Sequence, residues 1–178
     1  MLNILKCGLK WEKVFAKFLI FALLIITLNF MVTFIGDFEC RADAKGRIVM
    51  PSAFKKAVGQ GEIRFVARKH LFEKCLEIYP YSHWEELLEQ LRKKLNPYNR
   101  KHDMLIRSFF KSAIDLPLDG NGRFLIPRRL MEQVGAERDV VLVGIDKKIE
   151  LWAKTVYDSM NDESDMIASL AEEILGET

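Results

Sequence analysis

Two short segments combine an acid, a glycine and an arginine at the same spacing. Residues 43–47 read Asp-Ala-Lys-Gly-Arg, and residues 119–123 read Asp-Gly-Asn-Gly-Arg. An aspartate can accept hydrogen bonds from the backbone amides of a tight turn, and glycine can adopt the positive φ that such turns need. Arginine presents a planar fork of donors that can form two hydrogen bonds with a phosphate or with guanine O6 and N7. The segments therefore predict two turns that could contact DNA.

Each residue of these turns has a predicted role that follows from its chemistry. The residues expected to shape the turns are Asp43, Gly46, Asp119 and Gly122. The residues expected to contact DNA are Arg47, Arg123, Lys45, Asn121 and Arg41. The first two arginines lead this set, the lysine would bind phosphate, the asparagine would make a weaker polar contact, and Arg41 would flank the first turn. Because the second turn has asparagine where the first has lysine, it carries one positive charge fewer.

A second interpretation accounts for the same acid and arginine. Each arginine can pair with the aspartate of its own turn and simply stiffen the loop. Such pairs are commonplace, so the residue types alone favour this structural role over DNA contact. A rigid hairpin would still suit a nucleic-acid contact, because its arginine would lose less entropy on binding than an arginine on a flexible tail.

The similarity of the two segments extends well beyond the turns. The matching segments are 43–59 with 119–135, 63–67 with 140–144, and 76–79 with 149–152. Their offsets are 76, 77 and 73 positions, and changes this small are what loops absorb. The chain is therefore predicted to be a tandem pair of half-domains. Each half would be marginal alone, so each is expected to cover the apolar face of the other.

The pattern of apolar and polar residues predicts the same order of elements in each half. A strand precedes each turn, and a short returning strand, a short helix and two more strands follow it. The predicted strands are 34–42, 48–50, 63–67, 76–79, 114–118, 124–126, 140–144 and 149–152. The predicted short helices are 52–58 and 128–134. Pro51 and Pro127 are expected in their first turns, and Gly59 and Gly135 are expected to end them.

Longer helices are predicted outside the strands. Residues 82–85 have the spacing of a capping box that opens a helix over 84–95, and residues 155–158 are expected to open a C-terminal helix in the same way. Apolar spacing predicts a connecting helix over 99–111. The stretch 92–111 is rich in lysine and arginine, a pattern that favours a solvated helix face over a nucleic-acid patch.

Composition limits the functions that the chain can have. Its 178 residues are 49% hydrophobic and 29% charged, as in an ordinary globular protein. The formal net charge of +2 becomes −1 without residues 1–30, so overall charge gives no argument for nucleic-acid binding. The cysteines Cys7, Cys40 and Cys75 form no C-x-x-C pair, and His70 with Cys75 lacks a second pair to complete a metal site. We expect a reducing compartment, no metal and no cofactor.

Catalysis is not expected from this sequence. It contains no G-x-S-x-G, no P-loop and no dinucleotide-binding fingerprint. The neighbouring acids Glu85 and Glu86 fall on a predicted solvated helix face and lack a catalytic partner. The chain is therefore predicted not to be an enzyme and to have no small-molecule substrate.

Residues 1–30 form an apolar amino-terminal extension. Residues 18–30 carry no charge and follow four lysines, as in a secretory signal, but a convincing cleavage site is lacking. The uncharged stretch is also shorter than the roughly 20 residues of a membrane span. We favour translation from Met31, because a complete domain begins directly after it, and therefore expect a cytoplasmic protein. Membrane association is expected only if the extension is translated and retained.

The paired motifs resemble the MraZ family, which is related to the AbrB-like swapped-hairpin regulators. The resemblance runs from Met31 to about Tyr157 and rests on segments 43–51, 75–80 and 119–127. One Asp-x-x-Gly-Arg turn alone is a weak signal, because turns of this kind are common. Two copies in this order, each followed by a Leu/Ile-Glu-apolar-aromatic strand, are specific. The amino-terminal extension has no place in that family.

The resemblance implies an α+β fold, a duplicated swapped-hairpin β-barrel of two pseudo-symmetric half-domains with peripheral helices. The domains would be the extension 1–30, a first AbrB-like half-domain with its helix at 31–95, a connecting helix at 96–112, and a second half-domain with the C-terminal helix at 113–178. With two turns in such a family, the DNA-contact interpretation of the arginines prevails over the structural one.

The resemblance also implies the biological role. It predicts a sequence-specific transcriptional regulator that forms a homo-oligomeric ring and associates with the nucleoid. Its partner would be double-stranded DNA with repeated promoter elements, in front of its own division and cell-wall operon. The alternative is a membrane-anchored or protein-interaction scaffold that uses the apolar extension.

Overall fold

The computed structural model describes residues 32–59, 64–160 and 164–176. Its contacts divide the chain into two compact units, Met1–Met31 and Val32–Thr178. All described residues belong to the second unit, so the expectations for residues 1–30 lie outside the described residues. Among the described residues, no helix is both long and apolar enough to span a membrane.

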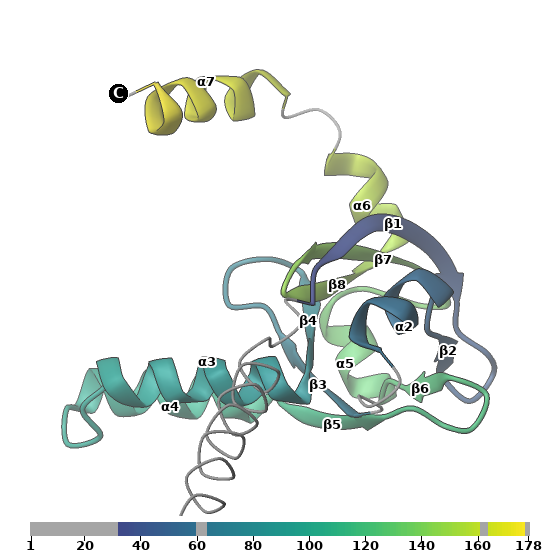
Figure 1. The fold of residues 1–178 in the computed structure, drawn as a ribbon, viewed down its shortest axis with the longest axis horizontal. Coiled ribbons are helices and arrows are strands. Elements are labelled where there is room, and N and C mark those ends of the chain that lie inside the picture. Colours follow the sequence, from purple (N-terminus) through teal and green to yellow (C-terminus); the bar gives the residue numbers. More distant parts are fainter. Residues whose placement is uncertain (1–31, 60–63, 161–163, 177–178) are drawn as a thin grey trace, which may run out of the picture. The chain divides into compact units, whose positions relative to one another are not determined.

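Each half of the described chain has two strands, a short helix, two more strands and then two further helices (Figure 1). The strands are β1 (Phe34–Arg41), β2 (Arg47–Val49), β3 (Arg64–Lys69), β4 (Cys75–Pro80), β5 (Ile114–Pro117), β6 (Arg123–Leu125), β7 (Asp139–Asp146) and β8 (Lys148–Ala153). The helices are α2 (Ser52–Val58), α3 (Tyr81–Lys94), α4 (Arg100–Lys111), α5 (Arg128–Gln133), α6 (Lys154–Ser159) and α7 (Ser164–Leu175).

Strands of the two halves are exchanged within one antiparallel sheet. Its order is β1-β7-β8-β4-β3-β5, and a separate two-stranded sheet joins β2 to β6. The first strand of the first half therefore pairs with β7 of the second half, and β5 of the second half pairs with β3 of the first. The predicted α+β class with swapped hairpins is confirmed.

The core lies on one face of the six-stranded sheet, where the two-stranded sheet, α2 and α5 cover it (Figure 1). Period-two alternation in the strands places their apolar side chains on this face. Ile48 of β2 lies opposite Phe124 of β6, and both are buried. These two residues are 76 positions apart, so they are equivalent in the repeat. The pairing of equivalent residues marks the position of a pseudo-twofold axis.

The opposite face of the six-stranded sheet carries a buried polar cluster. Glu77 on β4 lies directly opposite Glu150 on β8, and the Lys148 ammonium donates to these carboxylates at 2.7 and 2.8 Å. Arg68 also pairs with Glu77. Burial opposes the charge of Lys148, but its hydrogen bonds to Glu150 and Glu77 outweigh this effect and raise its pKa. The cations thereby offset the repulsion between the two carboxylates.

The same cluster includes a possible group of metal ligands. Ligand atoms of His70, Glu77 and Glu150 lie within 4.8 Å of one another. The Lys148 ammonium already bonds both carboxylates, so the group is an ion-pair network. His70 and Cys75 are joined only through their backbones, by a bond of 3.0 Å from the His70 amide to the Cys75 carbonyl.

Helices α3 and α4 form a hairpin that attaches to the sheet through aromatic side chains. Trp84 of α3 stacks on Phe109 of α4 with a centroid separation of 5.3 Å, and both belong to a cluster with Val66 and Tyr79 of the sheet. The Asn99 side chain caps α4 by accepting from two backbone amides of its first turn. The predicted connecting helix is therefore confirmed almost to the residue.

The predicted helix starts are wrong at both capping boxes. Helix α3 begins at Tyr81 and α6 begins at Lys154, and neither start has a side-chain cap hydrogen bond. The preceding strands β4 and β8 run directly into these helices, so Ser82 and Thr155 already lie inside the first turn. The single C-terminal helix is also wrong, because the structure describes two helices, α6 and α7.

A proline immediately precedes each of the helices α2, α5 and α3. Pro51 and Pro127 sit one position before α2 and α5, at φ −52° and −58° with extended ψ, instead of inside the first turn. Pro80 has the same conformation before α3. The proline ring fixes a φ near −65° that serves both the ending strand and the helix entry, so no capping side chain is needed for the change of direction.

Candidate nucleic-acid interface

The first turn is held by hydrogen bonds that centre on its aspartate. The Asp43 amide donates to the Arg47 carbonyl at 2.9 Å, and the Asp43 carbonyl accepts from the Gly46 amide at 2.9 Å. Its Oδ1 atom accepts from the amides of Lys45 at 2.8 Å and Arg47 at 3.0 Å. A carboxylate that accepts from two backbone amides in this way fixes the loop in one shape.

The second turn repeats each of these bonds. The corresponding backbone distances at Asp119 are both 2.8 Å. Its Oδ1 atom accepts from the amides of Asn121 and Arg123, both at 2.9 Å. The two turns therefore share one backbone design, and the turn-shaping role predicted for the aspartates agrees with this geometry.

Each arginine forms a two-pronged ion pair with the aspartate of its own turn. Arg47 donates to Asp43 Oδ2 from Nε at 2.7 Å, with Nη2 at 2.6 Å, and Arg123 holds Asp119 with both atoms at 2.9 Å. Hydrogen bonding by Arg47 lowers the pKa of Asp43 to about 2, and backbone and side-chain bonds from Arg123 lower that of Asp119. The bracing pairs anticipated from the residue types are thus present.

Bracing and exposure coexist at both arginines. The side chains of Arg47 and Arg123 are 33% and 27% exposed. The aspartate occupies the Nε and Nη2 side of each fork, and in the described part of the chain neither Nη1 atom makes a hydrogen bond. Each turn thus holds a pre-oriented guanidinium with a free donor side, which an incoming acceptor could use.

The glycines anchor each turn on the other half of the chain. Gly46 and Gly122 have φ of +83° and +68°, values that favour glycine. The Gly46 carbonyl accepts from the Ile126 amide at 3.2 Å, and the Gly122 carbonyl accepts from the Met50 amide at 3.0 Å. Because the two bonds cross between halves, neither turn can move without disturbing the opposite strand.

Strands β2 and β6 form an exposed ribbon between the turns. Arg47 pairs with Leu125 and Arg123 pairs with Val49, so these four side chains alternate on the face away from the core. Val49 and Leu125 are 54% and 51% exposed. Since the strands are antiparallel and each turn precedes its strand, the two turns lie at opposite ends of the ribbon.

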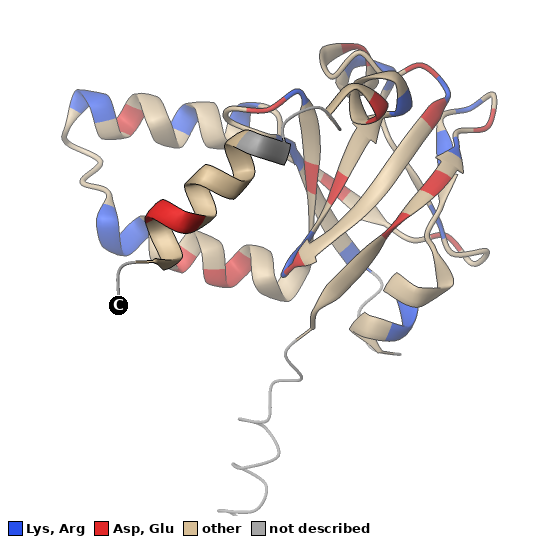
Figure 2. Ribbon diagram, turned by 90° about the horizontal axis from the view of Figure 1, so that it is seen from above, with Lys and Arg blue, Asp and Glu red and all other residues tan. Residues whose placement is uncertain are grey.

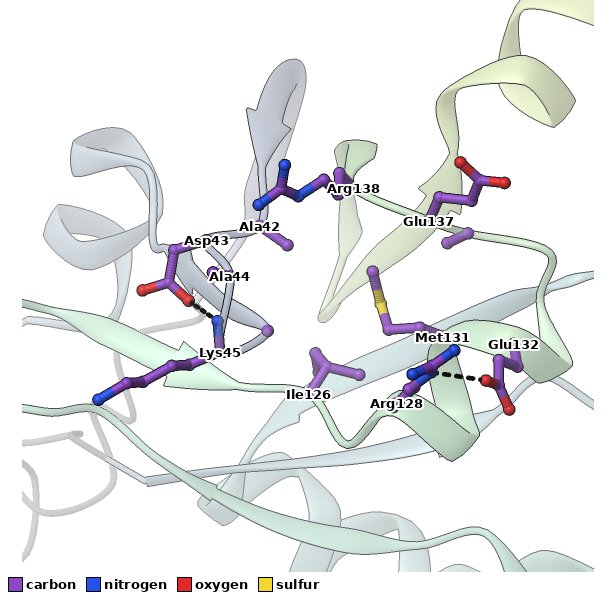
Figure 3. Close-up of a pocket in the computed structure, with 12 residues that line it drawn as sticks. Ala42, Asp43, Ala44, Lys45, Ile126, Arg128, Met131, Glu132, Glu137 and Arg138 are labelled. Carbon is purple, nitrogen blue, oxygen red and sulfur yellow. Dashed lines mark hydrogen bonds and ion pairs between the residues drawn. The ribbon is translucent and has the colours of Figure 1, made fainter.

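The remaining predicted contact residues are placed differently. Lys45 and Asn121 occupy equivalent exposed positions within the turns. Figure 3 shows the Lys45 side chain extending away from Ile126 and Met131, on the outer side of the first turn. Arg41 lies on β1, where it faces Asp139 at 3.4 Å. The structure therefore brings Lys45 and Asn121 to the turns but places Arg41 outside them.

Lys55 is a charge at the second turn that the sequence analysis missed. It lies on α2, and a methyl group added to Gly122 would meet its Nζ atom at 2.9 Å. The equivalent position near the first turn is the buried Met131, 76 residues further on. The shortage of charge predicted for the second turn is therefore offset by a lysine from another element. The sequence signal that could have revealed this charge is that the repeat has lysine at position 55 and methionine at position 131.

A surface hollow of about 690 Å³ lies beside the first turn (Figure 3). Ala42 and Gly46 line one side, and α5 with the segment before β7 lines the other. Arg128 and Glu132 of α5 pair across 2.8 Å at its margin. Its lining holds three basic and three acidic residues, so the hollow adds no net positive charge to the turn.

The basic stretch 92–111 belongs to the helical hairpin. Figure 2 shows that both helices of this hairpin carry acidic as well as basic residues, with those of α3 grouped so that the basic ones lie in its last turn. Lys93 pairs with Glu89 at 2.8 Å and Arg107 pairs with Asp103, each one helical turn away. This pairing is what the solvated-face interpretation predicts.

Comparison with known proteins gives a consistent family. The family model of the MraZ protein, described as antitoxin-like, matches twice, over residues 33–107 and 109–175. The "Transcriptional regulator MraZ" of Bacteroides fragilis is 38% identical over 148 residues, which cover 83% of this chain and 94% of that protein. The regulator of the same name from Bacteroides thetaiotaomicron is 43% identical over 125 residues, 70% of this chain and 80% of that protein.

A more distant organism gives the same result. The "Transcriptional regulator MraZ" of Clostridium tetani is 34% identical over 141 residues, which cover 79% of this chain and 96% of that protein. The family consists of regulators and not of enzymes, in agreement with the absence of catalytic motifs. The two family matches, the similarity over most of each relative and the swapped-hairpin fold lead to one conclusion: the chain belongs to the MraZ family of transcriptional regulators.

Proposed function

We propose that this regulator binds double-stranded DNA sequence-specifically through the β2–β6 ribbon and the two turns at its ends. The observation that carries the proposal is the pair of equivalent turns, each with an oriented arginine, held rigidly at opposite ends of one exposed ribbon. A two-stranded ribbon fits the major groove of B-DNA, and strands are an established reading element there.

The contacts divide into base reading and phosphate binding. Arg47 and Arg123 reach guanine O6 and N7, or a phosphate, with the donors that their aspartates leave free. Lys45 at the first turn and Lys55 at the second neutralise phosphates and hold the ribbon in register. Asn121 adds a polar contact at the second turn. The chain needs no large net charge for this role, because the charges are concentrated at the ribbon.

The ring assembly implied by the family resemblance is part of this proposal. We propose that a second copy of the chain packs against the exposed apolar side chains of α4 and α7. These side chains are Met104, Leu105, Phe110, Met166, Ile167, Leu170 and Ile174. Basic residues accompany those of α4 and acidic residues those of α7, so the two faces are complementary in charge. Several ribbons on one ring would gain affinity for repeated elements through multivalency.

The target follows from the same family resemblance. We propose repeated elements in the promoter of the protein's own division and cell-wall operon, which would place the protein at the nucleoid. The test is a gel shift with the full chain on the DNA upstream of its gene, at several salt concentrations. Binding is expected to weaken steeply as salt rises, because phosphate contacts release counterions.

The matched variants decide which surface binds. Arg47→Ala and Arg123→Ala are expected to lose most binding while circular dichroism stays unchanged. Arg107→Ala is the control, because Arg107 also pairs with an acid four positions away but lies on α4. Equal binding by the ribbon variants and the parent would refute the proposal, and loss in the control alone would move the interface to the helical hairpin.

A further inference from the structure

A second surface hollow lies away from the ribbon and collects positive charge. It has a volume of about 370 Å³ and is bounded by the end of β3, the end of α4 and helix α5. Lys69, Lys111 and Arg129 reach it from these three elements, together with the hydroxyls of Ser108 and Ser112. Its lining contains no aspartate or glutamate. This composition distinguishes it from the hollow beside the first turn.

Among the residues that the structure describes, the three cations have no acidic partners. Within the described ranges, the ion pairs of the chain include none made by Lys69, Lys111 or Arg129. The neighbouring Arg128, by contrast, holds Glu132 at 2.8 Å. Like charges gathered without counter-charges repel one another, and an anion bound between them would remove that repulsion.

The polar groups around the cations are held in place. The Ser112 hydroxyl oxygen accepts from the Lys69 amide at 3.0 Å, which ties the end of β3 to the end of α4 and leaves the hydroxyl hydrogen free to donate. His70 shapes the adjoining loop, because its Nδ1 atom accepts from the amides of Phe72 and Glu73 at 3.1 and 2.8 Å. The hollow thus has a fixed frame and free donors.

The acid that faces His70 does not cancel this charge. Glu77 faces the Nε2 atom of His70 at 3.5 Å, but it is buried and already bonded to Lys148 at 2.7 Å and to Arg68. Its charge is therefore taken up inside the sheet cluster and is not available to the cations of the hollow.

We propose that this hollow, formed by Lys69, Lys111, Arg129 and the two serine hydroxyls, is a second anion site that binds phosphoryl groups. Three cations from three elements, with hydroxyl donors between them, match the several oxygens of a phosphoryl group. The polar lining selects a small, highly charged group over an apolar ligand. The phosphoryl groups have two possible sources, a free polyphosphorylated molecule or the backbone of DNA held by the ribbon.

The first measurement uses inorganic triphosphate as the probe. Calorimetric titration of the full chain is expected to show saturable binding that Arg129→Gln weakens about tenfold and that the triple variant Lys69→Gln/Lys111→Gln/Arg129→Gln abolishes. The matched control removes three exposed cations from the end of α3, as Arg92→Gln/Lys93→Gln/Lys94→Gln. Binding is expected to survive in this control.

The second measurement separates the two sources. If the triple variant loses triphosphate binding, a free phosphorylated ligand is supported. If the parent ignores triphosphate but the triple variant lowers the salt dependence of DNA binding, and the α3 control does not, the site binds the DNA backbone. No effect in either measurement, or equal losses in the control, overturns the proposal. Arg47→Ala should leave triphosphate binding intact. A failure of the ribbon proposal can therefore be distinguished from a failure of the anion-site proposal.

Discussion

The two turns have the same backbone but obtain their positive charge from different places. Each holds its aspartate with equivalent bonds, at distances that agree within about 0.2 Å. The first turn carries its lysine within the loop as Lys45, whereas the second receives Lys55 from α2. The comparison shows that a repeat can keep a rigid frame while the charge moves to a neighbouring element. A comparison of the loop sequences alone underestimates the positive charge at the second turn.

The largest effect is expected when the arginines are removed one turn at a time. Arg47→Ala and Arg123→Ala should each weaken DNA binding by about 10- to 100-fold, because each removes a two-pronged contact. Equal losses would show that both ends of the ribbon read DNA. A loss confined to Arg47→Ala, measured by gel shift at fixed salt, would show that the second turn is only structural.

Alanine substitutions of the glycines should separate the turns by stability. Both positions need a positive φ, so Gly46→Ala and Gly122→Ala should each lower the free energy of unfolding by about 1–2 kcal/mol. The new methyl group would lie 3.1 Å from the Ile126 carbonyl oxygen at Gly46, but near the flexible end of Lys55 at Gly122. Gly46→Ala should therefore cost more in urea unfolding. The reverse order would contradict the described packing.

The lysines should produce a smaller effect of equal size at the two turns. Lys45→Gln and Lys55→Gln should each reduce the slope of log affinity against log salt by about one per contact, without changing which DNA sequence is preferred. Lys56→Gln is the control, because it removes a neighbouring exposed charge of α2. If only Lys45→Gln had an effect, Lys55 would not supply the charge that the loop sequence of the second turn lacks.

Acid should weaken the turns in a defined window. The pKa of Asp43 is lowered from 3.8 to about 2, so its ionised form stabilises the folded state above pH 4. That contribution should disappear as the pH falls from about 4 to about 2, where Asp43 becomes protonated in the folded state as well. The difference in urea midpoint between parent and Asp43→Asn should shrink over this range. Asp119→Asn should show the same direction, since the pKa of Asp119 is also lowered.

Much of the fold was predictable because it depends on local patterns. Period-two alternation located the strands, and Asp-x-x-Gly-Arg located both turns within a residue. The helix starts were wrong because strands β4 and β8 lead directly into α3 and α6, so that no cap is needed. A capping-box spacing is a local signal, and here the entry is determined by the preceding strand instead.

The contact residues were less predictable because their surroundings are set by tertiary structure. The duplication predicted that the halves cover each other, but the partner of each strand was not readable from either half. Lys55 escaped notice because its turn lies more than 60 residues away in sequence. Arg41 was predicted to flank the first turn, and its ion pair with Asp139 on β7 could not be read from the sequence around it.

The crossed pairing of β1 with β7 has a consequence for synthesis. The ribosome releases β1 about 100 residues before β7, which at roughly 5–20 residues per second is a delay of several seconds. Through that interval the earlier strand has no partner, and the ribbon cannot exist until β6 has been made. A chain that ends before β6 would therefore lack the surface proposed to read DNA.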